Sequence, residues 1–205
     1  LIEGLAKNLY RRHDPFVSPY LHHFLAEENR HMTLFGEFCT RYAGKIYPDK
    51  KMAVPREFAD GEEEFLFFIK VMIFEEVVDV YNRTMADDSR LVPLARQINR
   101  LHHVDESRHL AFGRVMAKWL FKRYSPQWSD ETLIGIRNCV AAYLEMTWRE
   151  YYNAEVYRDA GLEDPYGLCE RAWARPQARA HRRRINQRVI QYLQESGILW
   201  EAPTS

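Results

Sequence analysis

Apolar residues recur every three to four positions along most of this 205-residue chain, a spacing that places them on one face of an α-helix. The strict alternation of apolar and polar residues that is typical of β-strands is absent. Pro, Gly, Asp and Ser separate the periodic segments, where they start or end helices. The pattern predicts an all-α protein with helices at Leu1–Arg12, Ser18–Tyr42, Gly61–Met85, Leu91–Tyr124, Thr132–Ala160 and Ala178–Ser196, and a shorter helix containing Leu168 and Trp173.

The predicted helix Gly61–Met85 is apolar almost all round, which is typical of a helix inside a bundle. Glu75 and Glu76 follow its apolar run, and Asp79 comes one turn later. A carboxylate among apolar neighbours must be paired, protonated or bound to a metal. We therefore expect one of the two glutamates to be a metal ligand and the other to pair with Arg83 or with a basic residue of another helix.

Length and composition indicate one globular domain spanning residues 1–205, with 46% hydrophobic and 28% charged residues. The formal net charge is zero, so no overall field favours a nucleic acid or an anionic membrane, and we expect neither as a partner. We interpret the basic run at residues 181–184 as a solvated helix face.

Three cysteines far apart in the sequence do not form a disulfide framework and fit a reducing, cytoplasmic location. The most apolar run, residues 65–74, is too short to span a bilayer. Because the chain begins inside a helical pattern and without Met, we expect the natural protein to extend further upstream.

Candidate metal ligands occur in two helical motifs. His102, Glu106 and His109 stand at positions i, i+4 and i+7, so their side chains fall within about 60° of one another around the helix axis. Glu28 and His31 repeat the Glu-x-x-His part of this motif in an earlier helix. Two such helices, with a glutamate from each of two others, provide the ligands of a di-iron carboxylate bundle. Either motif alone would equally fit a solvated helix face or an i, i+3 hydrogen bond.

Three further carboxylates could contribute. Asp105 stands four residues before His109, where it either hydrogen-bonds the distal nitrogen of that imidazole or faces solvent. We expect Asp79 to support a metal ligand in the same indirect way. Glu3 borders the apolar stripe of the first helix, where it is either a metal ligand or an acidic residue favoured by the helix macrodipole.

At these residues the chain resembles the AurF-like family of non-haem di-iron arylamine N-oxygenases. The resemblance covers roughly the middle half of the chain, and its discriminating feature is the histidine four residues before the second Glu-x-x-His. It implies a ferritin-like helical bundle with additional C-terminal helices and a centre of two Fe ions. Glu28 and His31 would bind one iron, and His102 and His109 the other, with Glu106 shared or on the second iron. The family's spacing favours Glu75 over Glu76, and Glu3 is the candidate from the first helix, although it lies closer in sequence than the family pattern implies.

The resemblance also implies an activity. Dioxygen would be the co-substrate, and a small-molecule amine would be oxidised at nitrogen to the hydroxylamine, nitroso or nitro product. An external electron donor and a homodimer are further expectations. Two alternatives remain open, namely a di-iron hydroxylase or desaturase that acts on carbon, and a non-catalytic ferritin-like metal-binding bundle. Manganese could also replace one iron, because carboxylate-rich sites accept both metals.

Overall fold

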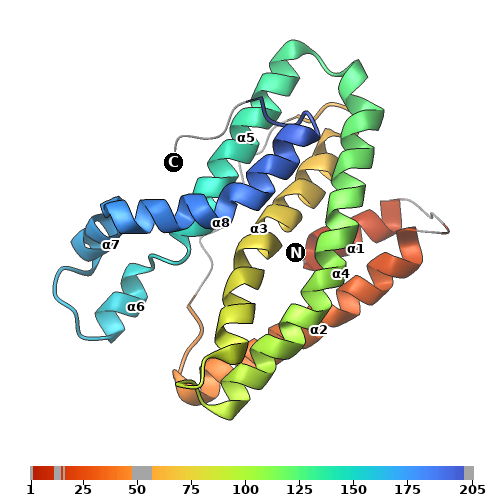
Figure 1. The fold of residues 1–205 in the computed structure, drawn as a ribbon. Coiled ribbons are helices and arrows are strands. Elements are labelled where there is room, and N and C mark those ends of the chain that lie inside the picture. The colour runs from red at the N-terminus through yellow and green to blue at the C-terminus, as the bar shows by residue number, and fades with distance from the viewer. Residues whose placement is uncertain (1, 12–14, 16, 48–56, 201–205) are drawn as a thin grey trace. The chain divides into compact units, whose positions relative to one another are not determined.

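The computed structural model describes residues 2–11, 15, 17–47 and 57–200 (Figure 1). These residues form helices and no strand, which confirms the all-α prediction. The long helices and the shorter ones that follow them agree with a ferritin-like helical bundle extended at its C-terminal end. No helix in the described part of the chain is both long and apolar enough to cross a membrane. The helices are α1 (Ile2–Arg11), α2 (Val17–Tyr42), α3 (Glu62–Asp87), α4 (Pro93–Tyr124), η1 (Ser125–Gln127), α5 (Asp130–Arg149), α6 (Ala154–Asp159), α7 (Pro165–Ala174) and α8 (Pro176–Glu195).

The helix ends follow the local signals in the sequence. Ser129 caps α5, because its hydroxyl accepts a hydrogen bond from the backbone N–H of Thr132 at 3.1 Å. Gly44 follows α2 and Gly197 follows α8, with φ values of 75° and 72° that most other residues avoid.

One predicted helix is wrong in extent, because the segment Thr132–Ala160 is not continuous. The N–H groups of Tyr151 and Tyr152 bond to carbonyls three residues back, at 3.1 and 3.0 Å, which closes tight turns after α5. The side chain of Asn153 then accepts a hydrogen bond from the N–H of Glu155 at 2.9 Å and caps α6. The asparagine side chain thus offers the backbone an alternative to the helix that the apolar spacing predicts.

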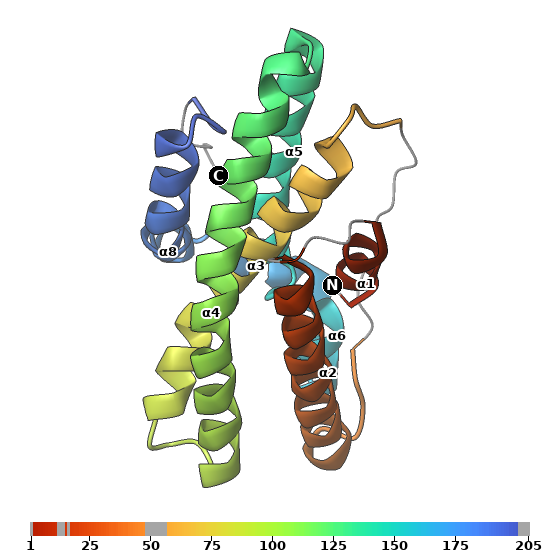
Figure 2. The ribbon, with the colours of Figure 1, turned by 90° about the vertical axis from the view of Figure 1, so that its right-hand side faces the viewer.

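The contacts group the chain into two compact units. The first holds the described residues of Leu1–Ala53 and Val78–Val115, and the second those of Val54–Val77 and Met116–Ser205. Helices α3 and α4 each contribute to both units, and the single-domain organisation stays a prediction. In the first unit α1 lies against α2 (Figure 2). The buried apolar residues of α1 are Leu5 and Leu9.

The second unit has an apolar core. The ring of Phe65 on α3 lies 5.5 Å from that of Phe121 and 5.7 Å from that of Trp128. The indole N–H of buried Trp148 donates a hydrogen bond to the side-chain oxygen of Asn186 at 2.8 Å, so this polar group has a partner inside the core. The apolar residues of this unit with an exposed fraction of at most 1% are Phe65, Phe68, Ile69, Met72, Ile73, Val77, Ala117, Leu120, Ile136, Val140, Leu144, Val189, Leu193 and Ile198.

Candidate metal centre

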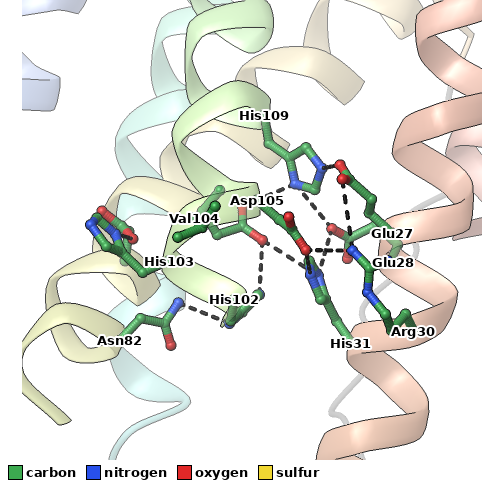
Figure 3. A network of polar contacts seen from close by, with 12 residues as sticks. Glu27, Glu28, Arg30, His31, Asn82, His102, His103, Val104, Asp105 and His109 are labelled. Carbon is green, nitrogen blue, oxygen red and sulfur yellow. Dashed lines mark hydrogen bonds and ion pairs between the residues drawn. The ribbon is translucent and has the colours of Figure 1, made fainter. Parts of the chain in front are cut away.

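Helices α2 and α4 both place a Glu-x-x-His motif in the interior of the first unit (Figure 3). Glu28 and His31 come from α2, and His102, Glu106 and His109 come from α4. All five side chains are buried, with exposed fractions between 0% for Glu106 and 9% for Glu28. The helical spacing therefore brings the predicted residues together at one buried position.

The ligand atoms form two groups that share Glu106. In one group, Oε1 of Glu106 lies 2.8 Å from Nε2 of His102 and 3.6 Å from Nδ1 of His31. In the other, Oε2 of Glu106 lies 3.2 Å from Nδ1 of His109, and the same nitrogen is 3.2 Å from Oε1 of Glu28. Within each group one donor atom per residue lies within 4.8 Å of the others. The two oxygens of Glu106 thus face different groups.

This donor set fits a pair of metal ions. Ligand atoms that surround one cation at about 2.1 Å stand roughly 3 Å apart, close to most of the spacings observed here. Imidazoles and carboxylates together suit iron and manganese. The grouping differs from the expected one, because His31 joins His102 and Glu106, whereas Glu28 joins His109 and Glu106. Oε1 of Glu28 also lies 3.3 Å from Nδ1 of His31, so this carboxylate stands between the groups.

Two of the imidazoles are held on their far side by carboxylates from the opposite helix. Nε2 of His31 lies 3.0 Å from Oδ2 of Asp105 on α4, and Nε2 of His109 lies 2.9 Å from Oε2 of Glu27 on α2. The sequence left Asp105 either beside His109 or in solvent, but its buried side chain reaches across to His31 on α2 instead. Such outer carboxylates fix the orientation of a ligand imidazole and increase its basicity.

Two arginines neutralise these outer carboxylates. Arg30 donates to Asp105 at 2.6 Å, and Arg108 donates to Asp105 at 2.6 Å and to Glu27 at 2.5 Å. Burial opposes ionisation of Asp105, but hydrogen bonds from His31, Arg30 and Arg108 outweigh it and lower its pKa to about 2. Asp105 is therefore an anion at neutral pH.

Charge within the centre is balanced by shared protons when no cation is present. Burial favours neutral His109, but hydrogen bonds with Glu106 and Glu28 outweigh it and raise the pKa of His109 to about 9. Burial likewise opposes ionisation of Glu28, and hydrogen bonds from His109 and His31 nevertheless lower its pKa. A metal cation would take the place of these protons.

Sequence reasoning missed Glu27 and Asn82. Glu27 could have been found, because the order acid, Glu, any residue, Arg, His occurs twice, at residues 27–31 and 105–109. Asn82 carries no comparable signal. It lies on α3 and contacts His102 across the helix pair, with 2.8 Å between its Nδ2 and Nδ1 of the imidazole.

Three other predicted residues belong to neither of the two ligand groups. Asp79 was expected to support a metal ligand, but it lies 2.6 Å from Nδ1 of His103, which belongs to neither group, and it pairs with Arg83 at 3.5 Å. Glu3 is exposed on α1, whose buried stripe is formed by Leu5 and Leu9, and it does not join the buried cluster. Glu75 is buried and belongs to the second unit, so its role as a ligand stays a prediction.

Comparison with known proteins gives one match. A family model described as P-aminobenzoate N-oxygenase AurF matches residues 1–197. No curated protein and no solved structure matches the chain.

Proposed function

Because the chain belongs to the AurF family of p-aminobenzoate N-oxygenases, we propose that its buried cluster binds two iron ions and that it oxidises an amine nitrogen with dioxygen. The proposed ligands are Glu28, His31, His102, Glu106 and His109, and Glu75 is proposed as a further ligand from α3. Glu106 would bridge the two ions, since its two oxygens face different groups.

The observation that carries this proposal is the position of His102. A pair of Glu-x-x-His motifs is common to many di-iron bundles, whereas His102 adds a third buried imidazole, 2.8 Å from the shared glutamate. An additional imidazole fills a coordination position that water would otherwise take. It does not favour iron storage, because a storage site must release its metal.

When bound, the iron pair would supply electrons to dioxygen. The protein side chains would orient the ligands and exclude water. Asp105 and Glu27 accept from Nε2 of His31 and His109, which leaves Nδ1 of each ring to face the cations. Phe24 stacks on His109 at 3.8 Å between ring centroids, and Phe35 meets the edge of His102 at 5.1 Å. These rings help to keep the oxidising centre dry.

The proposed substrate is a small aromatic amine, because the family description names p-aminobenzoate as the compound that is oxidised. Oxidation would begin with the hydroxylamine and could continue to the nitroso and nitro levels, with electrons from an external donor. Homodimer formation stays a prediction.

Product analysis tests the proposal. The chain is loaded with iron(II) without oxygen, and then mixed with a reductant, dioxygen and a panel of amines that includes p-aminobenzoate. We expect a product that has gained oxygen and has lost its primary amine. A product that gained oxygen at carbon and kept its primary amine would instead support a hydroxylase. Failure to bind iron would leave only a structural role for the cluster.

A further inference from the structure

Two arginines connect the buried cluster to the protein surface. Arg30 donates to Asp105 at 2.6 Å, and Asp105 lies 3.0 Å from Nε2 of His31 (Figure 3). Arg108 also donates to Asp105 at 2.6 Å, so the two guanidinium groups meet at one carboxylate. Two hydrogen bonds in series therefore join each arginine to a proposed ligand of the metal centre.

These arginines present positive charge to solvent. The side chains of Arg30 and Arg108 are 56% and 44% exposed, whereas that of Asp105 is 11% exposed. Each ion pair thus has its cation outside and its anion inside. Residues 93–115 of α4 include four arginines and two acids, and both acids, Asp105 and Glu106, are buried. The exposed charge on this stretch of α4 is therefore positive.

Apolar side chains accompany Arg108 on one flank of α4. At 100° per residue, Leu101, Val104, Arg108 and Val115 fall within about 60° of one another around the helix axis. The three apolar residues are exposed, by 47%, 52% and 67% in chain order. Exposed apolar residues together with arginine are typical of a surface that binds another protein. We call these four residues and Arg30 the arginine face.

The charge of the arginine face selects the class of partner. A second copy of the chain that used the same face would bring arginine against arginine, and like charges disfavour a complex. An acidic protein would meet complementary charge, which speeds association and fixes orientation. The proposed function requires a protein or small molecule that supplies electrons from outside. Because electron transfer slows steeply with distance, a donor gains from docking where the ligands are close to the surface.

We propose that the arginine face docks an acidic protein that carries one electron at a time. This inference rests on the proposed two-iron centre. Two reduced carriers would each give one electron, so that two iron(III) ions become iron(II) and both carriers leave oxidised.

Binding of a plant-type [2Fe–2S] ferredoxin, an acidic one-electron carrier, tests the arginine face. The full chain, loaded with iron and oxidised, is titrated with oxidised ferredoxin at low ionic strength in a calorimeter. Val104→Glu should weaken binding about 10-fold, because it places a like charge in the interface. Val104→Lys should strengthen binding, and added salt should weaken it. The rate at which reduced ferredoxin reduces the chain without oxygen, followed by absorbance, should change in the same order.

Met32→Glu is the matched control. Met32 is also an exposed apolar residue, at 61%, but it points about 160° away from Arg30 around α2. This variant should bind ferredoxin as the wild type does. Reduced lumiflavin, a small carrier that needs no docking surface, should reduce all the variants at the wild-type rate. Circular dichroism checks that each variant folds, and if Val104→Glu does not, the Lys variant decides alone.

Three outcomes would overturn the proposal. They are a wild-type chain that does not bind ferredoxin, equal affinities in the two Val104 variants, and a wild-type dimer that Val104→Glu dissociates in analytical ultracentrifugation. The last would assign the arginine face to a second copy of the chain. Amine oxidation driven by reduced lumiflavin, without ferredoxin binding, would refute this inference alone. A chain that binds no iron would refute the proposed function itself.

Discussion

The two units of this protein differ in the number of charged side chains that they bury. In the first, four buried carboxylates lie in or beside the two ligand groups, namely Glu27, Glu28, Asp105 and Glu106. In the second, the deepest side chains are apolar, with Leu144 at 1% exposure as an example. An apolar core stabilises a fold by burial and packing alone. Buried carboxylates are costly unless they are paired, and here they outnumber the two arginines, Arg30 and Arg108, that pair with them.

We therefore expect stability and chemistry to depend on different buried residues. The polar interior of the first unit is explained by the cations that it is proposed to hold, and the apolar interior of the second by packing. Substitutions among the buried polar residues of the first unit should therefore change iron binding, and substitutions among the apolar core residues of the second should change the free energy of unfolding.

Glu106→Ala should have the largest effect, because Glu106 is common to both ligand groups. We expect iron to be lost from both positions and amine oxidation to fall to background, with the helical content unchanged. Metal analysis and circular dichroism check this. The control is Glu37→Ala, an exposed glutamate of α2. A variant that retains both irons would show that Glu106 does not bridge them.

His102→Ala should remove or strongly weaken one iron and leave the other, since His102 belongs to one ligand group. Iron content near one per chain, with an intact helical fold, is the expected result. His22→Ala, at an exposed position of α2, is the control. Full activity with two bound irons would remove the reason for preferring an N-oxygenase over other di-iron proteins.

Arg108→Gln should have a moderate effect, because Arg108 touches neither ligand group but pairs with both outer carboxylates. Loss of its hydrogen bonds should let both outer carboxylates turn away from the ligand imidazoles, and should therefore weaken iron binding about 10-fold. A chelator competition measures the change, and Lys118→Gln, at an exposed position of the same helix, is the control. Equal iron affinities in the two variants would show that the outer network does not support the ligands.

Leu144→Ala should leave iron binding unchanged and lower the free energy of unfolding by about 2–5 kcal/mol, because it opens a cavity in the apolar core. Denaturant unfolding and metal analysis on the same samples check both parts. Ile134→Ala, at a position that is 50% exposed, should destabilise the protein far less. Loss of iron from Leu144→Ala without unfolding would contradict the separation of the two interiors.

Much of the fold could be predicted from the sequence, because apolar spacing and cap residues act locally. Ser129 and Gly197 mark helix ends that the structure confirms. The break after Arg149 could not be predicted from apolar spacing, because tyrosines continue the apolar pattern across it. The side chain of Asn153 decided that boundary.

The predicted ligands Glu28, His31, Glu106 and His109 converge because each motif follows the periodicity of its own helix. What could not be predicted depends on contacts between helices. The spacing along α4 allowed a hydrogen bond between Asp105 and His109, but in the structure Asp105 contacts His31 on α2. The partners of His31 and His109 come from the opposite helix. They therefore could not be predicted from the periodicity of one helix alone.

Magnetic coupling between the two proposed irons would show whether Glu106 joins two cation positions. The iron-loaded, oxidised chain is measured by Mössbauer and electron paramagnetic resonance spectroscopy, with its iron content determined on the same sample. From the proposed centre we expect two irons per chain that couple to a diamagnetic ground state with no resonance signal. A full-intensity signal from isolated high-spin iron(III), or an iron content of one or less per chain, would contradict this account.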